Sequence, residues 1–140
     1  MIKKPTSELM DALTGNPSID NYMQTESEHL INEPLSSYLD QLVSEKGLKK
    51  SQVLKNADMN EIYGYQIFSG SRFPSRDKLL SLALGMHLSL DETQQLLKYA
   101  GFSPLYPKNK RDSILIWCIH HAFSLFETNE HLYSHEQTTL

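Results

Sequence analysis

The sequence contains little of what a secreted, disulfide-bonded or membrane-spanning protein needs. Cys118 is the only cysteine in the 140 residues, which excludes a disulfide within the chain and favours a reducing compartment. The longest strongly apolar run, residues 114–119, is far shorter than the roughly 20 residues that cross a bilayer. The polar residues after Met1 lack the apolar segment of a signal peptide. We therefore expect a cytoplasmic protein that does not span a membrane.

Glycine and proline are also scarce, with six of each, and no segment shows the alternation of polar and apolar residues that marks a half-buried strand. A hydrophobic content of 39% suits a globular core. Most glycines and prolines fall where a helical pattern begins or ends, often beside Asn or Ser. The sequence therefore predicts an all-α fold, with helices in residues 6–31 (one or two, broken at 15–17), 34–46, 50–57, 61–69 and 75–84.

Basic residues are scarce at both ends of the chain. Residues 112–140 contain no Lys or Arg and carry a balance of −4, and residues 1–45 contain only Lys3 and Lys4 and carry −6. The middle, residues 46–111, holds eleven Lys and Arg against five acids. Such an asymmetry indicates a surface that faces phosphates, although the net charge of the whole chain is −4. Ordinary scatter of surface charge is the alternative interpretation.

The second half of the chain repeats itself with an offset of 35 residues and no gap. Residues 76–84 (RDKLLSLAL) match residues 111–119 (RDSILIWCI), and residues 88–93 (LSLDET) match residues 123–128 (FSLFET). In both copies a serine is followed three residues later by a glutamate, the pattern of a capping box at a helix start. Each copy therefore predicts a helical hairpin, in which a short turn joins one helix to a capped second helix.

These patterns divide the chain into three parts: an acidic N-terminal helical segment at residues 1–33, a helical domain at residues 34–100, and a C-terminal αα-hairpin at residues 101–140 packed on that domain. In the connector between the two hairpins, Phe102, Leu105 and Tyr106 are expected to pack between them. The apolar run of the last hairpin predicts a helix that is buried on all sides. Packing within the chain and a homodimer through this hairpin both remain open.

The helical domain contains short helices with a tight break between the second and third, which is the geometry that braces one helix against a DNA groove. About 55 residues, from Leu35 to Leu90, resemble the Cro/repressor-like (XRE) helix-turn-helix family. The fold implied is a lambda repressor-like helix-turn-helix bundle. The positions that carry the resemblance are Gly47, Leu48, Val53, Ala57, Met59, Ile67, Gly70, Pro74, Ser75, Leu79, Leu82, Ala83 and residues 88–92.

The resemblance implies that the helix at residues 61–69 reads the major groove of double-stranded DNA. It would place phosphate-binding cations beside this helix, since Lys and Arg supply the salt-dependent part of the affinity. Gln66 can bond adenine through two hydrogen bonds, and the Ile and Tyr side chains can contact thymine methyls. The residues expected to contact DNA are Lys49, Lys50, Glu61, Ile62, Tyr63, Tyr65, Gln66, Arg72 and Arg76. For Arg76, an ion pair with Asp77 or a capping role at the helix start is the alternative.

Two positions depart from the family's pattern. Gly64 stands where the family places a buried branched residue, and Leu54 stands where it prefers a small alanine. We interpret this as an exchange of volume, in which Leu54 fills the space that Gly64 leaves. Two further positions bear on function, because Glu61 brings a carboxylate close to the expected phosphates and Phe68 is apolar where the family has an acid.

No arrangement of residues indicates catalysis. The chain has no motif for a nucleophile with its base and no glycine-rich loop for phosphates. His131 and His135 lie four residues apart, but two imidazoles are fewer than a zinc site requires. We expect no enzyme activity, no metal and no cofactor.

The sequence therefore predicts a sequence-specific DNA-binding protein of transcriptional control. The alternative is a protein-interaction module on the same fold that has lost DNA binding. In that case the apolar and aromatic side chains of Ile62, Tyr63, Tyr65 and Phe68 would bind a partner protein.

Overall fold

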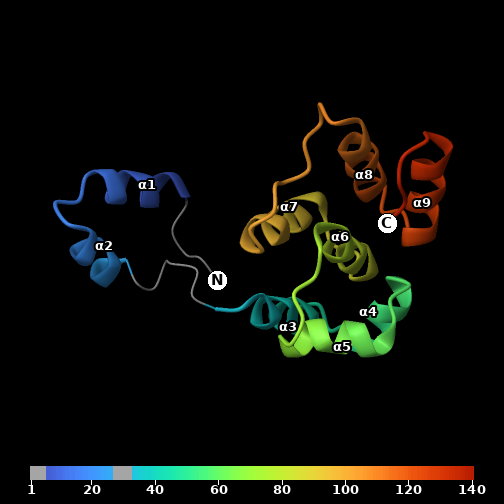
Figure 1. Ribbon diagram of the computed structural model, residues 1–140, viewed down its shortest axis with the longest axis horizontal. Helices are drawn as coiled ribbons and strands as arrows, with labels where there is room; N and C mark the ends of the chain where they lie inside the picture. Colours follow the sequence, from blue (N-terminus) through green and yellow to red (C-terminus); the bar gives the residue numbers. More distant parts are fainter. Residues whose placement is uncertain (1–5, 27–32) are drawn as a thin grey trace. The chain divides into compact units, whose positions relative to one another are not determined.

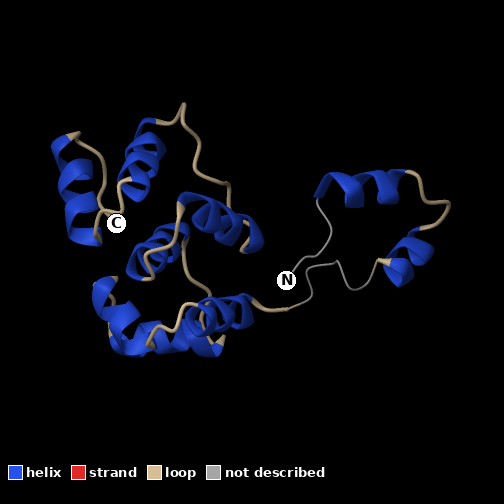
Figure 2. Ribbon diagram, turned by 180° about the vertical axis from the view of Figure 1, so that it is seen from behind, coloured by secondary structure: helices blue, strands red, loops and turns tan. Residues whose placement is uncertain are grey.

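The computed structural model describes residues 6–26 and 33–140, and every regular element in them is an α-helix (Figures 1 and 2). This confirms the all-α prediction. The chain divides into two compact units between Glu33 and Pro34. In the first unit, α1 (Thr6–Thr14) and α2 (Ile19–Thr25) are separated by the break expected at residues 15–17. Residues 27–31 of the expected N-terminal helices lie outside the described part of the chain.

The second unit contains the helices α3 to α9. Their ends fall within one or two residues of the expected boundaries, because local capping determines most of them: Asn60 caps α5, Ser75 caps α6 and Gly70 ends α5 in the left-handed region with a φ of 85°. No helix in residues 6–26 and 33–140 has the length and apolarity to cross a membrane. The seven helices are α3 (Leu35–Glu45), α4 (Lys50–Asn56), α5 (Glu61–Ser69), α6 (Arg76–Gly85), α7 (Leu90–Tyr99), α8 (Lys110–His120) and α9 (Leu125–Ser134).

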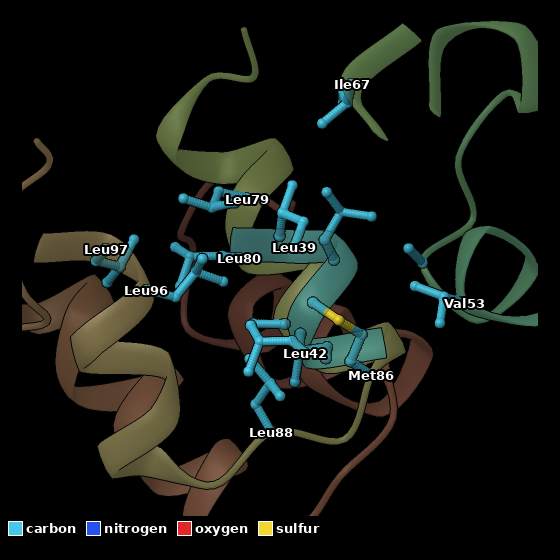
Figure 3. Close-up of a cluster of buried hydrophobic side chains, with 14 of the residues drawn as sticks. Leu39, Leu42, Val53, Ile67, Leu79, Leu80, Met86, Leu88, Leu96 and Leu97 are labelled. Carbon is cyan, nitrogen blue, oxygen red and sulfur yellow. The ribbon is translucent and has the colours of Figure 1, made fainter. Parts of the chain in front are cut away.

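The core of the second unit is built around α6. Every residue of this helix from Leu79 to Gly85 is buried. Figure 3 shows leucines of α3, α6 and α7 meeting in one cluster, which continues to Val53 of α4 and Ile67 of α5. At Gly85, α6 comes so close to α4 that an added Cβ would lie 2.6 Å from the Val53 carbonyl oxygen. The glycine is therefore required by the close approach of two helices.

The structure agrees with the expected exchange of volume between Leu54 and Gly64. Both residues are buried, with Leu54 on α4 and Gly64 on α5. A Cβ added at Gly64 would overlap Leu54 Cδ2 and lie 2.7 Å from Leu54 Cδ1. The leucine side chain thus occupies the volume that a larger residue at position 64 would take, and the contact fixes the distance between the two helices.

Residues that are equivalent in the 35-residue repeat form equivalent hydrogen bonds. Ser89 with Glu92 and Ser124 with Glu127 form both expected capping boxes. In the second box, the hydrogen bond from the Ser124 N–H holds the pKa of the Glu127 carboxyl below its ordinary value. The equivalence continues past the helices. The Gln94 side chain bonds both backbone groups of Leu105, and the Asn129 side chain does the same with Leu140.

The two copies are joined by ion pairs that cross between them. Arg76 of the first copy holds the Asp112 carboxylate with bonds of 3.1 and 3.2 Å, and Arg111 of the second holds Asp77 with bonds of 2.8 and 3.0 Å. Because each contact recurs with the roles of the copies exchanged, the two hairpins are related by an approximate two-fold axis. The sequence interpretation that paired Arg76 with its neighbour Asp77 was wrong, since tertiary packing brings a better-placed carboxylate to each guanidinium.

Two further expectations about the C-terminal hairpin need correction. Leu105 of the connector is buried and Phe102 is half-buried, but Tyr106 is 56% exposed. The hairpin packs within the chain, where α8 buries Leu115, Cys118 and Ile119. Helix α8 is not buried on all sides, because Trp117 is 46% exposed. The neighbouring helices cover only part of the apolar run, and the side of α8 that carries Trp117 remains exposed.

The contact between Leu54 and Gly64 can be tested by a double-mutant cycle. We expect Gly64→Ile alone to overpack the space and lower the free energy of unfolding by about 1–3 kcal/mol. Adding Leu54→Ala, which alone opens a cavity, should recover part of this loss. Urea denaturation of the four proteins measures the coupling. Losses that simply add would contradict the exchange of volume.

Candidate nucleic-acid interface

One face of helix α5 packs against the core, and the opposite face is exposed. Its buried residues are Gly64, Ile67 and Phe68, which face the core. The Asn60 side chain accepts a hydrogen bond of 3.1 Å from the Tyr63 N–H and so fixes the start of the helix. Asp58, in the turn before it, has a φ of 49°, which allows α4 and α5 to be joined within a few residues.

The opposite face of α5 is open. Ile62 is 72% exposed and Tyr65 is 43% exposed, while Gln66 is half-buried and Glu61 is exposed at the first turn. Residues 62, 65, 66 and 69 follow helical spacing and form one stripe. The stripe thus offers another molecule two apolar side chains whose burial would remove apolar surface from water.

Arg72 joins this face from the loop after α5. Its Nε donates a hydrogen bond of 3.1 Å to Gln66 Oε1, and its guanidinium carbon lies 5.4 Å from the centre of the Tyr63 ring. The Arg72 N–H also donates to the Gln66 carbonyl oxygen at 3.2 Å. The loop is thereby folded back on the helix, and the exposed guanidinium is oriented by two side chains of α5.

Two lysines lie at the start of α4. Lys49 is exposed and precedes the helix. The Lys50 ammonium lies 2.9 Å from the Asp40 carboxylate and 5.2 Å from the centre of the buried Phe68 ring. The pair with Asp40 is open to solvent, and such pairs contribute at most about 1 kcal/mol. A phosphate can therefore compete with Asp40 for this ammonium.

Five of the nine expected DNA-binding residues lie on α5 itself, and Lys50 and Arg72 contact side chains of this helix. Lys49 precedes α4, and Arg76 is engaged elsewhere. The Arg76 guanidinium also donates to the carbonyl oxygens of Ser103 and Pro104, at 3.1 and 3.3 Å, besides holding Asp112. Its donors are engaged within the protein, so it joins the two hairpins and is not free to anchor a phosphate. Phe68, which the alternative function placed in a binding face, is 3% exposed and belongs to the core.

Three contacts of this surface had no signal in the sequence. They are the pair of Lys50 with Asp40, the hydrogen bond of Arg72 to Gln66, and the serine cluster after α5, where Ser69 and Ser71 hydroxyls lie 3.1 Å apart. Each joins residues whose spacing follows no helical or capping pattern. Two of them engage the cations Lys50 and Arg72, and Asp40 and Glu61 add negative charge, so this surface attracts phosphates only over a limited area.

The described residues include no group of three or more His, Cys, Asp or Glu side chains placed to hold a metal ion. In particular, the His135 Nδ1 lies 2.8 Å from the His131 carbonyl oxygen, which occupies that ring nitrogen. Comparison of the chain with family models, with curated proteins and with solved structures gave no match.

The different roles of Arg72 and Arg76 predict different effects on stability. Arg76→Ala would leave the nearly buried Asp112 carboxylate without its cation, and we expect a loss of about 2–3 kcal/mol in the free energy of unfolding, below the roughly 3–5 kcal/mol of a fully buried pair. Arg72→Ala removes exposed contacts and should change it by less than about 0.5 kcal/mol. Denaturant unfolding of both variants measures the difference, and equal losses would show that Arg76 is not a structural residue.

Proposed function

We propose that the chain is a sequence-specific duplex DNA-binding protein of transcriptional control, with α5 as its reading helix and a Cro/repressor-like (XRE) helix-turn-helix unit in α3 to α7. The observation that supports this most is the open face of α5, where Ile62 and Tyr65 are exposed beside the oriented guanidinium of Arg72. A single helix fits the width of the major groove.

Each part of the surface has a task in this proposal. Lys49, Lys50 and Arg72 bind phosphates and carry the salt-dependent affinity. Ile62 and Tyr65 contact thymine methyls, and Gln66 offers its amide nitrogen to a base while its oxygen holds Arg72. Glu61, at the helix start, accepts from a cytosine amino group and disfavours other bases at the same position.

A protein-interaction module is the second candidate. It is favoured by the 72% exposure of Ile62 and by the pairing of Lys50 with Asp40, which lowers the positive charge of the surface. Its binding face would consist of Ile62, Tyr63 and Tyr65, without Phe68. Such a contact would depend on apolar burial and would respond little to salt.

A salt titration separates the two candidates. We expect the affinity for a random labelled duplex to fall with salt with a log–log slope of several units, because each neutralised phosphate releases condensed counterions. Lys49→Ala, Lys50→Ala and Arg72→Ala should each reduce the slope by about one unit. Fluorescence anisotropy from about 20 to 200 mM salt provides the measurement.

The matched control is Lys98→Ala, which removes an exposed lysine from α7 and should leave the slope unchanged. The function would be refuted by a chain that does not bind duplex at the lowest salt. If Lys98→Ala reduced the slope as much as Lys50→Ala does, the binding surface would not be the one around α5.

Specific reading is tested by selecting bound duplexes from a random pool. We expect the chain to enrich a defined site, and Ile62→Ala and Gln66→Ala each to change the preferred bases at one or two positions with the salt slope retained. Enrichment of no sequence, or an unchanged site in both variants, would show that α5 does not read bases.

A further inference from the structure

The outer face of the C-terminal hairpin contains an apolar pocket of about 360 Å³, lined by Ser113, Ile114, Trp117, His131 and His135. The Trp117 ring, 46% exposed, lies against the His121 ring at 4.2 Å and meets the Phe123 and His131 rings edge-on at 5.3 and 5.2 Å. No Lys, Arg, Asp or Glu is among the five lining residues. A tryptophan held in this way is preorganised for contact, since its orientation is fixed before anything binds.

The 35-residue repeat indicates what such a face is for. The positions equivalent to Ile114, Trp117 and His120 in the first hairpin are Leu79, Leu82 and Gly85 of α6. These are buried, and Gly85 is where α6 meets α4. The first hairpin thus covers this face with another helix. The second hairpin has the same face, with a larger and more aromatic surface. In residues 33–140, α9 contacts Trp117 only through the edge of the His131 ring, and 46% of the Trp117 side chain stays exposed.

We propose that a second copy of this chain covers it, through a two-fold contact of α8 with α8 centred on Trp117. A two-fold axis buries both unpaired faces at once. It also matches opposite charges. The start of α8 carries the exposed Lys108 and Lys110, and its end lies next to the start of α9, where Glu127 and Glu130 are exposed. Antiparallel α8 helices bring the cationic end of each copy to the anionic end of the other.

The size of the patch sets the strength of the dimer. A fully exposed aromatic side chain buries roughly 150–250 Å², but Trp117 is only 46% exposed and its neighbours Phe123 and His131 are already half-buried. The patch therefore stays well below the roughly 800 Å² per partner of a standard interface. We expect a dissociation constant in the micromolar range, about 1–100 µM. The contact leaves the reading face of α5 open, because α5 and α8 lie on opposite sides of α6 in both views of the chain (Figures 1 and 2).

The full chain tests this inference without DNA, so its result is independent of the proposed function. Light scattering and sedimentation should show a monomer passing to a dimer as the concentration rises to about 200 µM. Trp117 is the only tryptophan, so its emission should shift to shorter wavelength over the same range. Trp117→Ser should weaken the dimer at least tenfold, as expected for a tryptophan at the centre of an interface.

The matched control is Tyr133→Ser, which removes a 79% exposed aromatic side chain outside the pocket and should leave the dimer intact. Lys110→Glu is a second variant that keeps the fold, because an acid in the first turn suits the helix dipole, and it should weaken the dimer by placing like charges together. A chain that stays monomeric overturns the proposal, as does a dimer that Tyr133→Ser weakens as much as Trp117→Ser. A Trp117 that becomes buried only when another protein is added would assign the face to that protein.

Discussion

The burial of α6 is the constraint on which the rest of residues 34–140 depends. The side chains from Leu79 to Gly85 are shielded on every side, so each neighbouring helix must present a surface shaped to this one. At Gly85 the missing side chain lets α4 approach until backbone meets backbone. The position of α4 then determines that of α5, because Leu54 reaches into the space above Gly64. The exposed face of α5 is therefore oriented by contacts that begin on the far side of the core.

The electrostatics of the α5 surface depend on how its cations are engaged. Lys50 and Arg72 both have partners within the chain, but they differ from Arg76 in the burial of those partners. The Lys50–Asp40 pair is exposed, with 40% and 49% of the side chains open to water, and water already screens most of its attraction. The Asp112 side chain is 9% exposed, so removing its cation would leave a charge with little water to solvate it. An ion pair with an aspartate is thus open to exchange with other anions at Lys50, whereas at Arg76 it stabilises the fold.

The repeat of the hairpin explains both the closure of the core and the exposure of Trp117. Where the two copies face each other, their ion pairs and apolar side chains are used in equal roles. On the faces turned away from each other, only the first hairpin is covered by a helix from outside the repeat, which is α4. Because the two hairpins repeat the same pattern of faces, the second hairpin has a face equivalent to the one that α4 covers in the first. This face is aromatic where the covered one is aliphatic.

The sequence by itself determined the helices and their ends. Asn60, Ser75, Ser89 and Ser124 satisfy backbone groups within a few residues of themselves, so their effect can be recognised without knowing the fold. The repeat was accessible for a similar reason, since regular spacing carries it, whereas the facing pair of Leu54 and Gly64 was expected from the resemblance to the helix-turn-helix family. Tertiary structure alone decided that Arg76 binds Asp112, that Lys50 meets Asp40 and that Trp117 remains exposed. These outcomes depend on which surfaces meet after the helices pack, and a carboxylate 36 residues away in the sequence becomes a neighbour only when the two hairpins are already in place.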